Sequence, residues 1–443
     1  MRREGRTWGY EAGRRAAPAL PRVAVRLISG HMTAEPDAST GGRGTAALYT
    51  LLSVMFINML GFGVIVPFLP FYAASFHAAP WQIGLVFSAY SLGSFFGEPF
   101  WGRLSDRVGR KPILISTVAA NCLCYGALAF APNIWAAIVI RIIGGMAAGN
   151  GSVVQGYIAD VTPVQFRAGR MARLGAAYNL GFILGPFVGG VLAKPSAGTA
   201  GYHLPLLLSS GLCLCSAIGI ALVVKESRER RKYMGRQPSR WVMFGYAARH
   251  PVVGRLMLLT FAVGVAFTAI ESTFALWAQH RFGWVPRDIG LCFGITGAVS
   301  ACCQFMLTGP LSRRFGEGPM LAVGMAGTVI CTALQPFSDG RFFTVALMAL
   351  MALSQSVAFP NSGALLSRSV DPDHQGQIMG LNNATGALAR VVGPQCGLGL
   401  LGLSINAAFY FGAAIVAPAI FLALGAGKAS QRDGPALSPV AAE

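Results

Sequence analysis

Long apolar segments alternate with short polar segments along residues 46–426. Each apolar segment is long enough to cross a hydrocarbon layer of about 30 Å as an α-helix, which takes about 20 residues. We therefore predict twelve membrane-spanning helices, at 46–70, 82–102, 113–131, 134–156, 171–193, 203–224, 253–278, 288–311, 319–336, 341–366, 376–400 and 403–426. Strand-like alternation is absent, and lipid offers no partner for unpaired backbone groups, so the expected fold class is an all-α membrane protein.

Composition supports a membrane protein. Of the 443 residues, 54% are hydrophobic and only 12% are charged, and the mean hydropathy of +0.55 is far above that of a soluble domain. The net charge of +18 could suggest a nucleic-acid partner. The position of the basic residues indicates membrane orientation instead, and we expect no nucleic acid to bind.

Lys and Arg concentrate in the segments that follow the second, fourth, sixth, eighth and tenth predicted helices. The other loops hold four, Lys194, Arg281, Arg287 and Arg341. This asymmetry predicts that both termini are cytoplasmic in a multi-pass protein of the plasma membrane, the inner membrane of a bacterium. Attraction of the bases to the anionic lipid of the bilayer is a secondary effect.

Three polar segments lie outside the predicted helices. Residues 1–44 are expected to form a disordered basic cytoplasmic tail, with Met32 as an alternative start of translation. Residues 225–252 form a basic cytoplasmic linker that divides the chain nearly in half, and 427–443 form a second cytoplasmic tail.

Enzymatic motifs are not found. All nine cysteines fall in predicted helices without a CxxC pair, and the sequence has no HExxH, GxSxG or GxxxxGK[ST] stretch. We therefore expect no disulfide framework, no metal site, no bound cofactor and no catalytic residues, and the protein is not predicted to be an enzyme.

The two halves of the chain repeat one another. PWQIGLVF at 80–87 matches PRDIGLCF at 286–293, GRLSDRVGRKP at 102–112 matches GPLSRRFGEGP at 309–319, and Gly185-Pro186 matches Gly393-Pro394. The three matches keep nearly one offset along the chain, which indicates a duplication of six helices plus six, at 45–224 and 253–426. Parallel duplication of this kind is typical of transporters, whose substrate site lies between the halves.

These motifs resemble those of the major facilitator superfamily, in particular its twelve-helix drug:proton antiporters of the tetracycline-efflux type. GRLSDRVGRKP is similar to the motif between helices 2 and 3, Arg141 with Gly145 is similar to the proton-linked motif of helix 4, and LGFILGPFVGG at 180–190 is similar to the antiporter motif of helix 5. The resemblance covers about residues 46–426. It implies the major facilitator fold, transport of a small molecule driven by protons, and a monomer.

The helix 5 motif places glycines four residues apart. Gly181, Gly185 and Gly189 form one smooth ridge, and Pro186 removes a backbone donor and favours a kink. A packing face is one interpretation. Because Gly393-Pro394 repeats the pattern, we expect both ridges to lie between the halves and to serve a conformational switch.

Arg141 is costly within a membrane helix, by about 2.5–3.5 kcal/mol or more. It shares a helical face with Gly145, Ala148, Ser152 and Gln155, which predicts a surface that lines a wet cavity. Snorkelling of the side chain to the membrane surface is the alternative. The resemblance implies a role in proton coupling.

Two acids and a base also fall within predicted helices. Glu98 and Glu271 are candidates for proton coupling, because burial favours the neutral acid; a fixed ion pair of Glu271 with Arg390, or a solvated Glu98, is the alternative. The first helix departs from the resemblance, since INMLG places Asn58 where many relatives carry Asp. Asn58 cannot carry a proton, so a facilitator or an altered stoichiometry stays open.

We predict a secondary active transporter that exports hydrophobic or amphiphilic small molecules by alternating access, with the proton gradient as its energy source. A same-fold uptake permease or metabolite exporter is one alternative, and a non-transporting receptor or scaffold is another. The predicted cavity combines Arg141, Glu98 and Glu271 with polar residues from several helices. These are Asn58, Tyr90, Gln155, Asn179, Gln304, Gln355, Asn382 and Arg390.

The GRLSDRVGRKP stretch is expected to form a turn with a switch. Gly102 would allow close helix contact, Gly109 the reversal of the chain, and bases such as Arg107 would hold the turn on the cytoplasmic side. By resemblance, Asp106 would meet the positive end of helix 11 and Arg110 would pair with Asp160. In the second copy, Arg313 replaces the acid and Glu317 replaces the base, so we expect unequal electrostatic parts for the halves.

Overall fold

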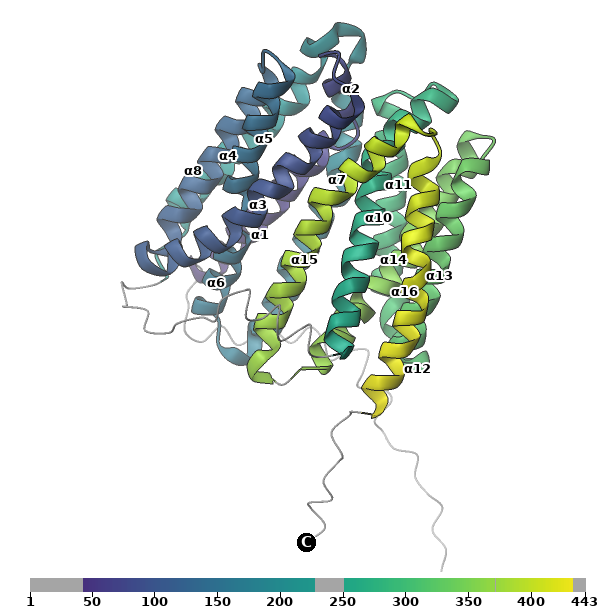
Figure 1. Ribbon diagram of the computed structural model, residues 1–443. Helices are drawn as coiled ribbons and strands as arrows, with labels where there is room; N and C mark the ends of the chain where they lie inside the picture. The colour runs from purple at the N-terminus through teal and green to yellow at the C-terminus, as the bar shows by residue number, and fades with distance from the viewer. Residues whose placement is uncertain (1–42, 228–250, 371, 433–443) are drawn as a thin grey trace, which may run out of the picture. The chain divides into compact units, whose positions relative to one another are not determined.

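The computed structural model of the protein describes residues 43–227, 251–370 and 372–432, and nearly all of them are helical (Figure 1). Their contacts separate a unit at Met1–Thr45 from a helical bundle at Ala46–Glu443. Ten described helices are long and apolar enough to cross a membrane. The predicted tail at 1–44, most of the linker at 225–252 and most of the tail at 427–443 lie outside the described residues.

The first half of the bundle matches the first six predicted spans. Two of them differ from a single helix. The span at 46–70 is interrupted after Ile65 by a turn that contains Pro67, whose ring removes a backbone donor, and the span at 134–156 breaks at Gly149 and Asn150. Its elements are α1 (Arg43–Ile65), α2 (Leu69–Ala74), α3 (Pro80–Val108), α4 (Arg110–Ala129), α5 (Ile134–Ala148), α6 (Gly151–Val161), α7 (Val164–Leu192), the 3₁₀-helix η1 (Pro195–Tyr202) and α8 (His203–Val223).

The second half matches the other six spans. The span at 288–311 contains a π-helical turn, η2, which joins two α-helices without a break. Its elements are α10 (Pro251–Phe282), α11 (Pro286–Cys303), η2 (Gln304–Thr308), α12 (Gly309–Phe315), α13 (Glu317–Leu334), η3 (Gln335–Phe337), α14 (Arg341–Arg368), α15 (Pro372–Gly399), η4 (Leu400–Gly402) and α16 (Ala407–Arg432).

Two long helices, α3 and α15, are not among the ten apolar ones, although each is long enough to span. They carry charged residues, including Glu98 and Asp106 on α3 and Arg390 on α15. The two helices pack against each other across the halves. A helix that faces another helix needs less apolar surface than one that faces lipid, which explains their polarity.

Equivalent helices pack together in the two halves. In the first half α3 packs on α5 and α4 on α8; in the second half α11 packs on α14 and α13 on α16. These pairs are related by the offset of the sequence repeat. The structure therefore confirms the internal duplication that the repeated motifs predict.

The halves share apolar packing at one end of the bundle. We call the end with the α3–α4 turn the motif end and the end with α2 the far end (bottom and top of Figure 1). One core cluster joins first-half residues such as Phe68 and Tyr72 to Phe274 and Trp277 of the second half at the far end. Towards the motif end, a separate cluster contains buried residues of the second half alone, from Val252 to Ala423.

Candidate transport pathway and switch

Small residues bring α3 and α5 into backbone contact. A Cβ at Gly97 would lie 2.9 Å from the Met146 Cα, and a Cβ at Gly149 would lie 2.5 Å from the backbone nitrogen of Glu98. Glycines permit this approach because no side chain separates the helices. The contact places two predicted site residues next to each other, Tyr90 of α3 and Arg141 of α5.

Arg141 is buried between these helices, with 4% of its surface exposed. Its Nε donates to the Val86 carbonyl oxygen at 3.3 Å, and its Cζ lies 4.6 Å from the centre of the Tyr90 ring. A side chain that is held inside the protein does not snorkel. Arg141 is therefore held by an aromatic face and one carbonyl group.

The predicted wet face around Arg141 is wrong in part. Gly145 and Ser152 of that face pack against α3, where Ser152 Oγ donates to the Glu98 carbonyl oxygen at 3.1 Å. The helix also breaks before Gly151, so Gln155 belongs to α6, where it is exposed. Small polar residues at a helical period here make a helix contact, which the sequence pattern does not distinguish from a cavity wall.

Four groups from both halves lie within electrostatic reach of one another. Arg390, Glu98 and Glu271 all act on the hydroxyl of Tyr178, a residue of α7 that was not predicted from the sequence. Arg390 is also the charge that acts on Glu271. Among the described residues, no ion pair within 4.0 Å joins Arg390 to Glu271, so the alternative of a fixed pair is not observed.

Asn58 forms a hydrogen bond within the first half. Its Nδ2 donates to Asn150 Oδ1 at 3.0 Å, and Asn150 Nδ2 in turn donates to Thr117 Oγ1 at 3.4 Å. Asn150 lies in the break between α5 and α6, so Asn58 connects α1 to that break.

The remaining predicted cavity residues are spread over the bundle. Asn179 of α7 and Gln304 at the start of the π-helical turn are exposed, whereas Gln355 of α14 is buried. Asn382 of α15 is half-buried, and its Oδ1 has no hydrogen-bond donor among the residues described. The structure thus groups Tyr90 with Arg141, and Arg390 with the two glutamates, and leaves the other cavity assignments as predictions.

Direct contacts between the halves lie toward the far end. Ser88 Oγ donates to the Val391 carbonyl oxygen at 2.6 Å, which joins α3 to α15. On α7, a Cβ at Gly190 would lie 2.7 Å from the Gly290 Cα of α11. The backbones of opposite halves therefore touch at these points.

The predicted location of the helix 5 glycine ridge is wrong. A Cβ at Gly185 would lie 2.7 Å from both the Gly63 Cα and the Leu60 carbonyl oxygen, so the ridge packs on α1 of the same half. The equivalent Gly393 packs on α10, where a Cβ would lie 2.7 Å from the Val265 carbonyl oxygen. The helix–helix contact between the halves uses the neighbouring face of α7, which includes Ile183, Phe187 and Gly190. A conformational role of Gly181, Gly185, Pro186 and Gly189 stays a prediction.

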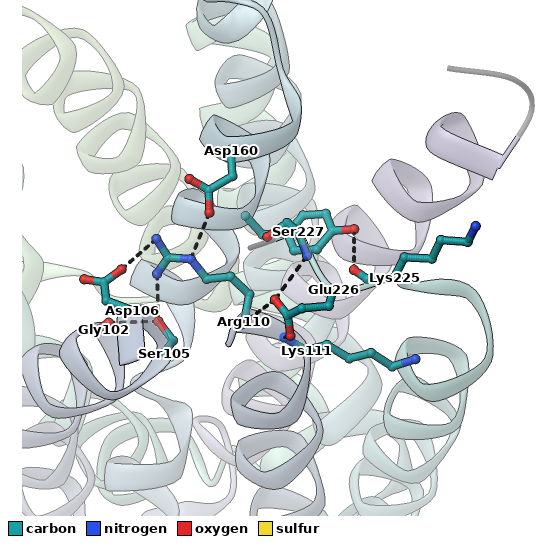
Figure 2. A network of polar contacts seen from close by, with 10 residues as sticks. Gly102, Ser105, Asp106, Arg110, Lys111, Asp160, Lys225, Glu226 and Ser227 are labelled. Atoms are coloured by element: carbon teal, nitrogen blue, oxygen red, sulfur yellow. Dashed lines mark hydrogen bonds and ion pairs between the residues drawn. The ribbon is translucent and has the colours of Figure 1, made fainter. Parts of the chain in front are cut away.

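The α3–α4 turn carries the network of charges shown in Figure 2. Gly109 has a φ of 114°, the left-handed conformation that favours glycine, and reverses the chain as predicted. Arg110 Nη2 lies 2.9 Å from Asp106 Oδ1, and Arg110 Nε lies 3.2 Å from Asp160 Oδ2 at the end of α6. The predicted pair of Arg110 with Asp160 is therefore confirmed.

Gly102, Arg107 and Asp106 of this turn were also predicted to have roles. A Cβ at Gly102 would lie 3.2 Å from Ser152 Oγ, so α3 does approach α6 closely there. Arg107 is exposed. The meeting of Asp106 with the start of helix 11 concerns side chains at 371–377, which lie outside the described residues; it stays a prediction.

Glu226 completes the network and was not predicted from the sequence. It follows the end of α8, and its carboxylate accepts hydrogen bonds from the backbone nitrogens of Arg110 at 2.8 Å and of Lys111 at 3.1 Å. These are the first nitrogens of α4, where a carboxylate satisfies free donors and complements the helix dipole. The sequence feature that could have indicated Glu226 is an acid at the start of a strongly basic linker.

The second half has an equivalent pair with its charges reversed. Glu317 Oε1 lies 3.0 Å from Arg368 Nη2, so the acid begins α13 and the base ends α14. In the first half the base begins α4 and the acid ends α6. The exchange of Arg110 for Glu317 is therefore compensated within its own half. No such compensating ion pair is found for Arg313 in the described part of the chain.

Comparison with known proteins identifies the family. The sequence profile of the Major Facilitator Superfamily matches residues 51–333 and 256–442, which together include most of the chain and both halves. The chain belongs to the major facilitator superfamily. Since this family is a family of transporters, the chain is a multi-pass membrane transporter.

Among similar proteins, this major facilitator protein is 30% identical to the tetracycline resistance protein, class C, of Escherichia coli, over 79% of this chain and 88% of that protein. It is 28% identical to multidrug resistance protein 2 of Bacillus subtilis, over 82% and 90% of the two chains. The solved structure of the nucleoside transporter NupG superposes with a TM-score of 0.73 at 11% identity, over 86% of this chain and 99% of that chain. The first two similarities extend the resemblance seen in the motifs, and the third shows the shared fold.

Proposed function

We propose that this major facilitator protein exports hydrophobic or amphiphilic small molecules in exchange for protons. The observation that carries the proposal is the group formed by Glu98 and Glu271 with Arg390 around Tyr178, from both halves of the bundle. Glu271 lies near Arg390 without an ion pair between them in the described residues, and an acid placed in this way can change protonation when the base moves. The resistance proteins among the relatives support export of drug-like compounds.

In this proposal the two halves rock about the contacts that join them. The far end is the closed end here, because one apolar core and the Ser88–Val391 and Gly190–Gly290 contacts connect the halves there. Closing the motif end would require those contacts to separate. The Arg110 network then acts at the end that opens and closes.

The distribution of Lys and Arg supports a cytoplasmic motif end and cytoplasmic termini in the plasma membrane. We further propose that the protein acts as a monomer and needs no cofactor besides the proton gradient. A membrane potential contributes about 2.3 kcal/mol per charge per 100 mV, so one exchanged proton can maintain a substantial substrate gradient.

The test is accumulation of a fluorescent amphiphile in cells of a pump-deficient strain, with and without the gene, before and after an uncoupler. We expect lower accumulation in cells that carry the gene, and we expect the uncoupler to remove the difference. The same accumulation with and without the gene, across a broad panel of compounds, would leave export without support.

A further inference from the structure

The halves meet through two equivalent contacts at the far end. One contact joins α3 to α15, and the other joins α11 to α7. The sequence repeat relates them, because Gly84 corresponds to Gly290 and Pro394 corresponds to Pro186. A Cβ at Gly84 would lie 3.2 Å from the Pro394 carbonyl oxygen. Likewise, a Cβ at Gly290 would lie 2.5 Å from the Pro186 carbonyl oxygen. The closed far end therefore uses the same contact of a glycine with a proline carbonyl group twice.

The residue that follows the proline differs between the two contacts. It is Phe187 on α7 and Gln395 on α15. Phe187 packs against α11, where a Cβ at Gly294 would lie 3.3 Å from the Phe187 Cβ. Gln395 directs its amide towards α3, where a Cβ at Gly84 would lie 3.1 Å from Gln395 Oε1. The α3–α15 contact thus holds an amide at the position where the α7–α11 contact holds an apolar ring.

The Gln395 amide nitrogen is not paired in this position. Nε2 is buried and has no hydrogen-bond acceptor in the part of the chain that the structure describes. The neighbouring Ser88 is paired, since its Oγ donates to the Val391 carbonyl oxygen at 2.6 Å. A buried amide nitrogen without an acceptor has lost the hydrogen bonds that it makes with water, and nothing replaces them. The amide of Gln395 therefore disfavours the closed α3–α15 contact.

Opening of the far end would remove this unfavourable contribution. In the proposed cycle the halves separate at this end, so α3 moves away from α15 and water reaches the amide. The contribution is then present in the closed state and absent in the open one. A group of this kind shifts the equilibrium between the two states, because its free energy differs between them.

We propose that Gln395 is a positioning residue of the transport cycle, whose unpaired amide weakens the α3–α15 contact so that the closed far end can open. Phe187 has no polar group at the equivalent place, so the α3–α15 contact is the weaker of the two. The inference rests on the rocking of the halves in the proposed function, and it does not depend on which substrate or ion is carried.

The experiment measures the distance between two spin labels on the purified full-length protein in nanodiscs, at low and at neutral pH. The labels replace Trp81 at the start of α3 and Leu403 beyond the end of α15, two exposed residues of opposite halves. They are attached to a genetically encoded keto amino acid, so the nine native cysteines are retained. The distance distribution gives the ratio of open to closed far ends.

Gln395→Leu replaces the amide by an apolar side chain of similar volume. We expect it to lower the ratio of open to closed far ends about tenfold, which corresponds to about 1.4 kcal/mol. Gln395→Met should produce the same shift, and it keeps the test available if Gln395→Leu does not fold. Neither variant should lower the thermal stability, whereas the loss of a residue with a merely structural role would lower it.

Gln279→Leu is the matched control. It makes the same exchange at an exposed glutamine near the far-end terminus of α10. Because the Gln279 side chain is already solvated, this variant should leave the ratio of open to closed far ends unchanged.

An unchanged ratio in Gln395→Leu and Gln395→Met, or a shift towards the open far end, would overturn the inference. An equal shift in Gln279→Leu would overturn it too, because the effect would then come from added hydrophobicity and not from the buried amide. A wild-type far end that never opens would reject the proposed rocking and this inference together. Opening of the wild-type far end without an effect of the Gln395 variants would reject only this inference.

Discussion

Glu317 and Arg368 form an ion pair of 3.0 Å at the positions where the first half holds Arg110 and Asp160, so the pair recurs with its charges reversed. In both halves it joins the helix that follows the glycine turn to the end of the next membrane span. The two pairs differ in burial. Arg110 is 9% exposed and also contacts Asp106 and Ser105, whereas Arg368 is 71% exposed.

The exposed Glu317–Arg368 pair should tolerate an exchange of its charges. Arg368→Glu places two acids together and should lower the thermal stability slightly, and the double variant with Glu317→Arg should restore it, because the pair is re-formed with opposite polarity. The coupling energy should not exceed about 1 kcal/mol, since the Arg368 side chain is largely exposed. A double-mutant cycle of thermal unfolding in detergent measures it. The same exchange of Arg110 and Asp160 should not restore stability, because Asp106 and Ser105 also depend on Arg110; full recovery there would show that the network is only a pair.

Asp106 provides a test of the switch. Asp106→Asn should fold and insert normally, because Arg110 keeps Asp160, but transport should fall about tenfold or more if the charge closes the motif end. Transport and protein level in membranes are the measurements. Asp339→Asn is the matched control, an acid that is 93% exposed in its pair with Arg281. Wild-type transport by Asp106→Asn would reduce the turn to a topological anchor.

Glu226 should stabilise the start of α4. Glu226→Gln removes the charge that accepts from the Arg110 and Lys111 nitrogens, and we expect a loss of about 0.3–1 kcal/mol that shrinks at high salt. Thermal unfolding at low and high ionic strength measures this loss. Lys225→Gln, an exposed neighbour, should have a smaller effect. A loss that does not depend on salt would argue against the electrostatic account.

Two glycines of α7 allow packing within one half and movement between the halves to be tested separately. Gly185→Ala should destabilise the protein, because its Cβ would lie 2.7 Å from the backbone of α1 in the same half. Gly190→Ala should instead disfavour the closed far end, because its Cβ would lie 2.7 Å from Gly290 of the other half. Thermal stability and cysteine accessibility from each side of the membrane distinguish the two effects. Gly175→Ala, with nothing within 4 Å, is the control and should change neither.

Glu271 should be necessary for coupling. Glu271→Gln removes the proton-carrying group near Arg390 while its size is kept, so we expect proton-driven export to be lost and exchange of substrate down its own gradient to persist. Transport into proteoliposomes with and without a pH gradient measures both. Full activity with an unchanged pH profile would contradict this role.

The sequence by itself determined the membrane architecture. The predicted spans, the duplication and the Gly109 reversal follow from hydrophobic length, repeat offset and glycine conformation, which can be read directly from the order of the residues. The Arg110–Asp160 pair joins residues 50 positions apart and was predicted only from the resemblance to a known motif. The helix breaks at Pro67 and at Gly149 could not be predicted, although both residues are present in the sequence. The reason is that the apolar run continues through each of them.

Only the tertiary structure decided which face meets which partner. The stripe of small residues in α7 could lie against α1 or against the other half, and in the structure it packs on α1. The helical face that holds Arg141 could line water or pack on a helix, and it packs on α3. Glu226 and Tyr178 acquired their partners from helices distant in sequence. Helical periodicity defines a face but not the neighbour that covers it, because that choice depends on how all twelve spans pack at once.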